Sequence, residues 1–272
     1  MKVYIAREGK VSPIFGVLSI AIAGVLLSAS RILFFFPDDT ATMFAWGIKD
    51  HMTCYLLGAG YFGGFVFFLW IVVRVFLFRN LYWNEIYSGI VGIVAFTIVM
   101  ALVTLKNPAS FASDGFPTIL WKLLYYALPF VLSLFVIANL RYLGKEVLGP
   151  HVNGVLKGLY FIVGITLCSA GIVLFLLPES VGQYWPWHLT KVTAQVVAGW
   201  IILPGVVGII LPLNPRLAAW RITIVAQMVS ILLIVFWGLV AWQTLYMGIA
   251  LSIFGGGLIV IFFLCFLILF DV

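Results

Sequence analysis

Long apolar stretches alternate with short polar segments along the whole chain. Eight of these stretches are about 20 residues long and carry almost no charge. An α-helix rises 1.5 Å per residue, so about 20 residues cross a hydrocarbon core roughly 30 Å thick. The stretches lack the two-residue alternation of a barrel strand, and a helix satisfies its own backbone hydrogen bonds in lipid. The pattern predicts an all-α, polytopic transmembrane helical bundle, with spans Pro13–Phe36, Thr53–Val75, Ile86–Leu105, Thr118–Leu140, Val155–Leu177, Thr193–Leu211, Leu217–Ala241 and Leu245–Phe270.

Composition supports the same class of protein. Hydrophobic residues make up 64% of the 272 residues and charged residues 9%, whereas a soluble domain has about 25% charged residues. The net charge is +6, but the Lys and Arg residues are spread over the loops and form no basic block, so nucleic acid is not predicted as a partner. The predicted partner is the lipid bilayer, with a homo-oligomer or a membrane-protein partner left open.

The distribution of cations predicts the orientation of the spans. If the N-terminus is cytoplasmic, four lysines lie on the outer side: Lys49, Lys106, Lys122 and Lys191. Ten cations then lie on the inner side: Lys2, Arg7, Lys10, Arg74, Arg79, Arg141, Lys145, Lys157, Arg216 and Arg221. The positive-inside rule therefore predicts that both termini are cytoplasmic. The remaining cation, Arg31, lies near the outer end of the first span, where its long stem can reach the interface.

The two halves of the sequence match without a gap at a constant offset of 141 residues. The matched pairs are Phe34 with Phe175, Pro37 with Pro178, Asp38 with Glu179, Trp46 with Trp187, Gly58 with Gly199, and Gly64 with Gly205. The matches fall where the chain leaves the first or fifth span and enters the second or sixth. They predict a tandem repeat of two four-helix units, residues 1–141 and 142–272, with the same orientation in the membrane. Chance matching of apolar sequence is the alternative.

Two segments resemble a known family. The stretch FAWGIKDHMTCYLLGAGY from Phe44 to Tyr61 and the stretch YWPWHLTKVTAQVVAGW from Tyr184 to Trp200 resemble the paired signatures of uncharacterised multi-spanning bacterial membrane proteins. The resemblance covers most of the chain and implies a protein of the bacterial plasma membrane without a known activity. The later signature usually has a proline and an arginine where this sequence has Lys191 and Gln195, so an anionic contact by that arginine is not expected.

Polar side chains gather on the predicted outer side. One hypothesis is a shared polar site in which Arg31 pairs with Asp38 or Glu179, while His51 and His188 face extracellular pH. The alternative is a set of solvated loop charges with one arginine that reaches the interface. Asp50, His51, Glu179 and His188 are residue types that zinc or iron accepts, but their spacing matches no metal motif, so neither a metal nor another cofactor is predicted.

Few polar residues lie inside the predicted spans, and none of them is Asp or Glu, which disfavours a proton relay. Gln195 and Gln227 are expected to hydrogen-bond between the sixth and seventh spans. The glycines Gly60, Gly64, Gly154, Gly158 and Gly255–Gly257 are expected to mark close helix contacts, and Pro129 and Pro204 to bend their helices.

The aromatic stretches around Trp46 and Trp187 are interpreted as an interfacial belt near short half-helices. The three cysteines, Cys54, Cys168 and Cys265, are expected to be free thiols. The sequence offers no pair of nucleophile and base and no phosphate loop, so an enzyme is not predicted. Two functions remain open: a transporter or permease-like protein for a small solute, and a structural or accessory membrane subunit. A water-accessible cavity between the halves would favour the first function, and a solid interface the second.

Overall fold

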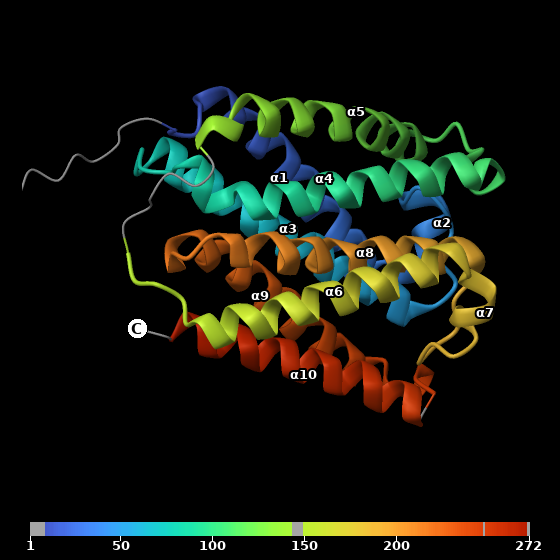
Figure 1. The fold of residues 1–272 in the computed structure, drawn as a ribbon. Helices are drawn as coiled ribbons and strands as arrows, with labels where there is room; N and C mark the ends of the chain where they lie inside the picture. The colour runs from blue at the N-terminus through green and yellow to red at the C-terminus, as the bar shows by residue number, and fades with distance from the viewer. Residues whose placement is uncertain (1–8, 143–148, 247, 271–272) are drawn as a thin grey trace, which may run out of the picture.

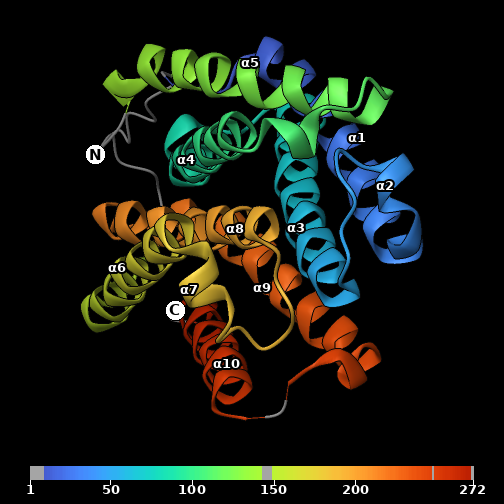
Figure 2. The same ribbon diagram turned by 90° about the vertical axis from the view of Figure 1, so that its right-hand side faces the viewer.

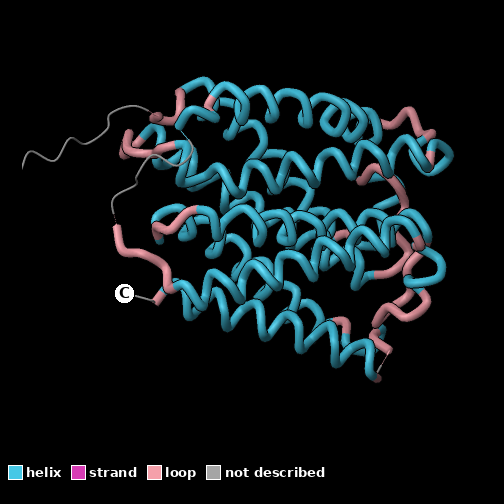
Figure 3. The backbone as a smooth tube through the Cα atoms, in the orientation of Figure 1, coloured by secondary structure: helices cyan, strands magenta, loops and turns pink. Residues whose placement is uncertain are grey.

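The computed structural model describes residues 9–142, 149–246 and 248–270, and eight long helices dominate them (Figure 1). All eight are long and apolar enough to cross a membrane, and the protein is an integral membrane protein. Figure 3 shows helices joined by short loops throughout the described chain. The predicted all-α bundle is therefore confirmed. The long helices are α1 (Pro13–Phe35), α3 (His51–Phe76), α4 (Trp83–Lys106), α5 (Phe116–Ala138), α6 (Gly154–Leu176), α8 (Lys191–Ile210), α9 (Leu217–Val240) and α10 (Ile249–Leu269).

Short helical segments lie between the long helices. They are η1 (Pro37–Asp39), α2 (Thr40–Met43), η2 (Pro108–Phe111), η3 (Leu140–Tyr142), α7 (Pro178–Gly182), η4 (Leu211–Leu213) and η5 (Trp242–Thr244). Local sequence sets the helix starts: the Ser12 hydroxyl accepts from the Phe15 N–H in front of Pro13, and the Asn153 side chain accepts from the Val155 N–H. Such caps satisfy the free N–H groups of the first turn.

Four helices form the centre of the bundle and four surround it. Helices α3 and α4 pack against α9 and α8, while α1 packs on α3, α6 on α8, α5 on α4 and α10 on α9 (Figure 2). Short helices α2 and α7 lie at one end of the bundle, which we call the Asp38 end (Figure 1). The first described residues and the end of α10 lie at the opposite end, which we call the Lys10 end.

The central helices touch backbone to backbone at glycines. A Cβ atom added at Gly63 of α3 would lie 2.8 Å from the Ala226 carbonyl oxygen of α9. A Cβ atom added at Gly92 of α4 would lie 3.2 Å from the Leu203 carbonyl oxygen of α8. At Gly63 only glycine permits such an approach, and at Gly92 an added Cβ atom would also press on the Val207 side chain. The two halves are thus in direct contact across the centre of the bundle.

Other glycines correct the sequence interpretation. Gly60 and Gly64 do face neighbours, the Trp200 ring and Leu26 respectively. Gly154, Gly158 and Gly255–Gly257 have nothing within 4 Å of an added Cβ atom, so the prediction that they mark close contacts is wrong within this chain. Spacing of small residues identifies a smooth helix face but not whether another helix lies against it.

The statement that the spans contain no Asp or Glu is also wrong. Helix α4 begins at Trp83, three residues before the predicted start, so Glu85 lies in its first turn and is only 7% exposed. Its carboxylate pairs with Arg74 of α3 at 3.2 Å and accepts from the Tyr82 N–H. This pairing lets the helix continue beyond the end of the apolar run.

The same hydrogen-bond pattern occurs in both halves at the Lys10 end. The Val11 N–H donates to the Leu81 carbonyl and the Trp83 N–H to the Gly9 carbonyl, at 3.0 and 2.9 Å. The Val152 N–H donates to the Pro215 carbonyl and the Leu217 N–H to the Pro150 carbonyl, at 2.9 and 3.0 Å. Each set forms an isolated antiparallel bridge, Lys10 with Tyr82 and His151 with Arg216. The residues before α1 therefore fix the start of α4, and the residues before α6 fix the start of α9.

Candidate functional site at the Asp38 end

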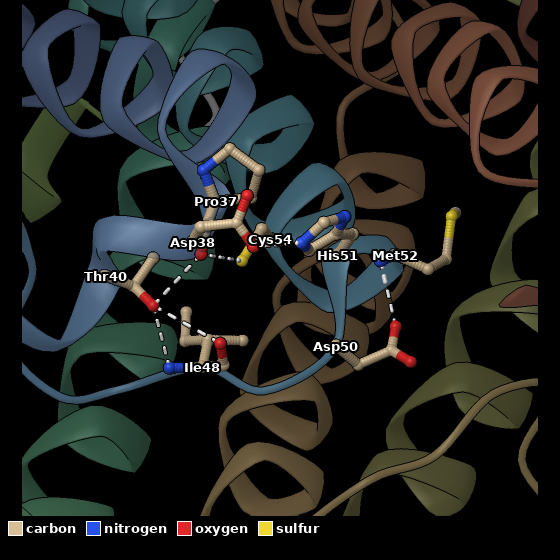
Figure 4. A network of polar contacts seen from close by, with 8 residues as sticks. All are labelled: Pro37, Asp38, Thr40, Ile48, Asp50, His51, Met52 and Cys54. Carbon is tan, nitrogen blue, oxygen red and sulfur yellow. Dashed lines mark hydrogen bonds and ion pairs between the residues drawn. The ribbon is translucent and has the colours of Figure 1, made fainter.

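Two ion pairs at the Asp38 end join equivalent elements of the two halves, with their acids at corresponding positions and their cations one residue out of register. The Asp38 carboxylate lies 2.8 Å from Nε2 of His51, the first residue of α3 (Figure 4). The Glu179 carboxylate lies 3.6 Å from Nζ of Lys191, the first residue of α8. Each acid follows the proline that ends the preceding long helix, Pro37 or Pro178, and each pairs with the start of the next long helix. Both pairs are solvent-exposed, so each holds its loop only weakly.

A buried hydroxyl holds the loop of the first pair in shape. Thr40 is 1% exposed, and its Oγ1 accepts from the Ile48 N–H at 2.9 Å (Figure 4). The same hydroxyl lies 3.3 Å from the carbonyl oxygens of Pro37 and Ile48, to either of which it can donate. This arrangement closes the segment between α1 and α3 into a compact loop and fixes the position of Asp38.

Asp50 is the N-cap residue of α3. Its carboxylate accepts from the Met52 N–H at 2.9 Å (Figure 4) and from the Thr53 N–H at 3.4 Å, and so caps the helix. Partial burial raises the pKa of Asp50 above its ordinary value. The two backbone hydrogen bonds, and after them the positive charges that His51 and His188 can carry, act in the opposite direction and do not cancel the effect of burial.

The structure does not gather the predicted polar residues into one shared site. Asp38 and His51 form one pair, Glu179 pairs with Lys191, and Asp50 caps a helix. Arg31 is exposed on α1 and makes no hydrogen bond or ion pair with any of the described residues. His188 is exposed in the loop before α8, where it contributes to the electrostatics of Asp50.

Aromatic side chains beside these pairs form two matching triangles. In the first half, the ring centroids of Phe44, Trp46 and Trp121 lie 5.1 to 5.9 Å apart. In the second half, those of Trp185, Trp187 and Phe254 lie 5.3 to 5.6 Å apart. Each triangle joins the loop after a short helix to the last long helix of its half. Phe44, Trp46 and Trp187 are buried, so the interpretation of these stretches as a belt at the membrane interface is wrong for these three residues.

Two side-chain hydrogen bonds, one buried and one partly buried, connect the halves at this end. The Trp187 indole N–H donates to the Thr53 hydroxyl at 2.9 Å, and both residues are fully buried. The Asn107 amide, at the end of α4, donates to Oε1 of Gln195 in α8 at 2.8 Å. The sequence does not single out Thr53 and Asn107 as functional, because a hydroxyl or an amide at a helix end has many local roles. The sequence signals that point here are the match between Trp46 and Trp187 and the polar residue Gln195 inside an apolar span.

The two glutamines join helices, but not to each other. Gln195 accepts from Asn107 and donates to the Phe175 carbonyl at 3.3 Å. Gln227 accepts from the Tyr160 hydroxyl and so connects α9 with α6. The expected hydrogen bond between the sixth and seventh spans is therefore replaced by bonds to the end of α4 and to two residues of α6. Both side chains have protein partners in the interior.

Four buried polar atoms have no hydrogen-bond partner among the described residues. They are Trp46 Nε1, Trp185 Nε1, Trp200 Nε1 and Thr223 Oγ1. Cys54, Cys168 and Cys265 are free, as predicted. In the described part of the chain, no group of three or more His, Cys, Asp or Glu residues could hold a metal ion. The polar chemistry at this end thus consists of local pairs, a helix cap and links between the halves.

No family model, no curated protein and no solved structure matches the chain. The family resemblance of the segments Phe44–Tyr61 and Tyr184–Trp200 stays a prediction.

Proposed function

We propose that the protein is a structural or accessory subunit of the membrane rather than a carrier of solute. The observation that supports this function most strongly is the direct contact between its halves. Gly63 and Gly92 bring α3 onto α9 and α4 onto α8 so closely that a Cβ atom added at either glycine would meet both a side chain and a backbone carbonyl of the other half. A packed interior of this kind is rigid and resists opening.

The polar groups between the helices support the same function. Gln195 and Gln227 both have protein hydrogen-bond partners, and the indole of Trp187 bonds to Thr53 across the interface. A solute pathway needs polar groups that face water or solute, whereas these groups hold helices together. The large apolar surface of the outer helices is available to lipid and to partner helices.

We also propose that the two halves are tandem copies of one four-helix unit. Three sets of matched contacts support this: the antiparallel bridges at the Lys10 end, the ion pairs at the Asp38 end, and the aromatic triangles. His151 follows Lys10 by the same offset that relates Trp187 to Trp46, whereas Arg216 follows Tyr82 by seven residues fewer. The partners His51 and Lys191 are related by one residue fewer than that offset, and Trp121 and Phe254 by eight residues fewer. Contacts that recur in the same order along both halves are hard to obtain by chance alone.

The Lys10 end is proposed to face the cytoplasm of a bacterial cell. Its described side chains include seven cations and one acid, Glu85. The seven cations are Lys10, Arg74, Arg79, Arg141, Lys157, Arg216 and Arg221. The described Asp38 end has five cations and five acids, so the asymmetry follows the positive-inside rule.

Transport of a small solute is the second candidate. The matched halves favour it, because duplicated membrane proteins commonly bind their solute at the pseudo-symmetry axis. Pro204 also lies inside α8, close to the glycine contact between the halves, where it removes one backbone donor. A transporter would need the two halves to move relative to each other, and a bend of α8 at this position would permit that movement.

Two measurements separate the candidates. In native membranes solubilised with a mild detergent, an accessory subunit is expected to migrate in an assembly larger than one chain. Recovery of only the single chain, after cross-linking in the intact membrane, would contradict that function. Isolation of differently tagged copies together would identify a homo-oligomer.

The second measurement is labelling of introduced cysteines by a water-soluble reagent, in a background without the three native cysteines. L203C lies at the contact between the halves and S110C is exposed at the Asp38 end. We expect labelling of S110C alone. Labelling of L203C would support a water-filled path and transport.

A further inference from the structure

An uncompensated lysine lies inside the span of α5. Lys122 follows the helix start, Phe116, by six residues, which corresponds to a depth of about 9 Å along the helix at 1.5 Å per residue. It has no hydrogen bond or ion pair with any of the described residues. A cation at this depth is costly unless an anion or the interface compensates it.

A shallow groove lies directly beside this lysine. It has a volume of about 460 Å³ and is lined by Ile119, Lys122, Leu123, Tyr126 and Ala127. These positions are spaced by three and four residues and so share one face of α5. Ala127 leaves the depression, since its neighbours on this face are larger. Apart from the ammonium group and the Tyr126 hydroxyl, the groove is apolar.

The groove lies on the lipid-facing side of the helix. Ile119, Leu123 and Tyr126 are exposed, and Phe130 and Leu134 continue the same exposed stripe deeper into the span. In an integral membrane protein such a stripe is available to the acyl chains of the bilayer. An acyl chain that follows α5 would run along the groove and onto Phe130.

The lysine can reach the head-group region from its position. Side chains on a helix tilt toward the N-terminus, and the N-terminus of α5 lies at the Asp38 end. The four-carbon stem of Lys122 can therefore extend toward the interface at that end and carry its ammonium group beyond the apolar residues of the groove. This places a positive charge where the phosphate of a lipid lies and an apolar surface where its acyl chain lies.

We propose that this groove binds one phospholipid in the leaflet at the Asp38 end. The phosphate of the lipid contacts the Lys122 ammonium group, and an acyl chain packs on Leu123 and Ala127. Trp121 corresponds to Phe254 in the matching aromatic triangle, so the residue of α10 that corresponds to Lys122 is Gly255. The position of α10 that corresponds to Lys122 therefore has no cation, and this site has no counterpart on the described α10.

The test is native mass spectrometry of the full-length protein with phosphatidylglycerol added to the detergent. The wild-type protein is expected to retain one tightly bound lipid, and K122A to bind it about fivefold more weakly, as expected for one cation near an anionic lipid. K122R should retain the lipid because it keeps the charge. A127F should release the lipid because the ring fills the groove while Lys122 is unchanged.

The controls identify the source of the affinity. K49A removes an exposed lysine from the same end and should bind as the wild type does. Diacylglycerol with the same acyl chains lacks the phosphate and should bind the wild type as weakly as phosphatidylglycerol binds K122A. Equal binding of phosphatidylglycerol by the wild type, K122A and A127F would overturn the proposal, and equal binding of diacylglycerol and phosphatidylglycerol by the wild type would overturn the role of the phosphate.

Discussion

Trp46 and Trp187 take corresponding places in the two halves, but only one of their indole N–H groups has an acceptor. Trp187 donates to Thr53, whereas Trp46 Nε1 is buried without a partner among the described residues. At the offset that relates Trp46 to Trp187, the position that corresponds to Thr53 is Ala194, which has no hydroxyl. The two halves therefore share an aromatic framework and differ in one polar contact.

The Trp187–Thr53 hydrogen bond gives a direct prediction. T53V keeps the shape of the side chain and removes the acceptor, which leaves a buried indole unpaired and should cost about 1 to 3 kcal/mol. The measurement is thermal or denaturant unfolding in detergent. T53S should keep the bond, and T42V, at an exposed position of α2, should change little. A T53V protein as stable as T42V would show that the bond contributes nothing.

Asp50 gives a prediction about pH. Because its pKa in the folded protein is above the ordinary value of 3.8, the folded state binds more protons than the unfolded state between these two pKa values. The contribution of Asp50 to stability should therefore increase as the pH falls through this window. D50N keeps an N-cap side chain and removes the titration. The difference in unfolding midpoint between wild type and D50N, followed from pH 7 to about pH 4, should shift in favour of the wild type. A constant difference would contradict the assignment.

At the scale of the elements, hydropathy is enough to predict the eight long helices, because helix length in a bilayer is set by the thickness of the hydrocarbon core. It fails at Glu85, since an ion pair with Arg74 lets α4 begin before the apolar run. The spacing of small residues fails at Gly154 and Gly158, because a smooth helix face does not show whether another helix packs against it. For the candidate site, the sequence identifies Asp38, His51 and Glu179 as polar positions. Their partners depend on the loop that Thr40 closes, and sequence spacing does not contain that geometry.

The connection between α3 and α4 can be tested through its ion pair. R74A would leave Glu85 buried without its cation and should cost about 3 to 5 kcal/mol. Adding E85Q to R74A removes the buried charge and keeps an acceptor for the Tyr82 N–H, so it should restore part of the loss. Unfolding of the two variants and of E85Q alone completes a double-mutant cycle. A double variant less stable than R74A would argue against a buried, uncompensated carboxylate.

For the whole molecule, the contact between the halves predicts where a single methyl group is not tolerated. G63A would place its Cβ against the Ser230 hydroxyl and 2.8 Å from the Ala226 carbonyl oxygen, and because the second atom belongs to the backbone, α3 and α9 must separate to accept it. Such overpacking typically costs about 1 to 3 kcal/mol. G158A is the matched control, because nothing lies within 4 Å of its Cβ and alanine favours the helix. Equal stability of the two variants would mean that the halves are less tightly packed than their backbone contacts indicate.

The two bridges at the Lys10 end differ in the length of chain that they enclose. The segment from Lys10 to Tyr82 is seven residues longer than the segment from His151 to Arg216, and α3 has 26 residues where α8 has 20. Seven additional residues amount to nearly two whole turns, which leaves a rotation of only about 20°. Residues before and after such an insertion keep nearly the same angular position around the helix axis. One half can therefore be longer than the other while the same helix face still packs against its neighbours. An insertion of five residues would rotate that helix face by about 140° and would turn core residues toward the lipid.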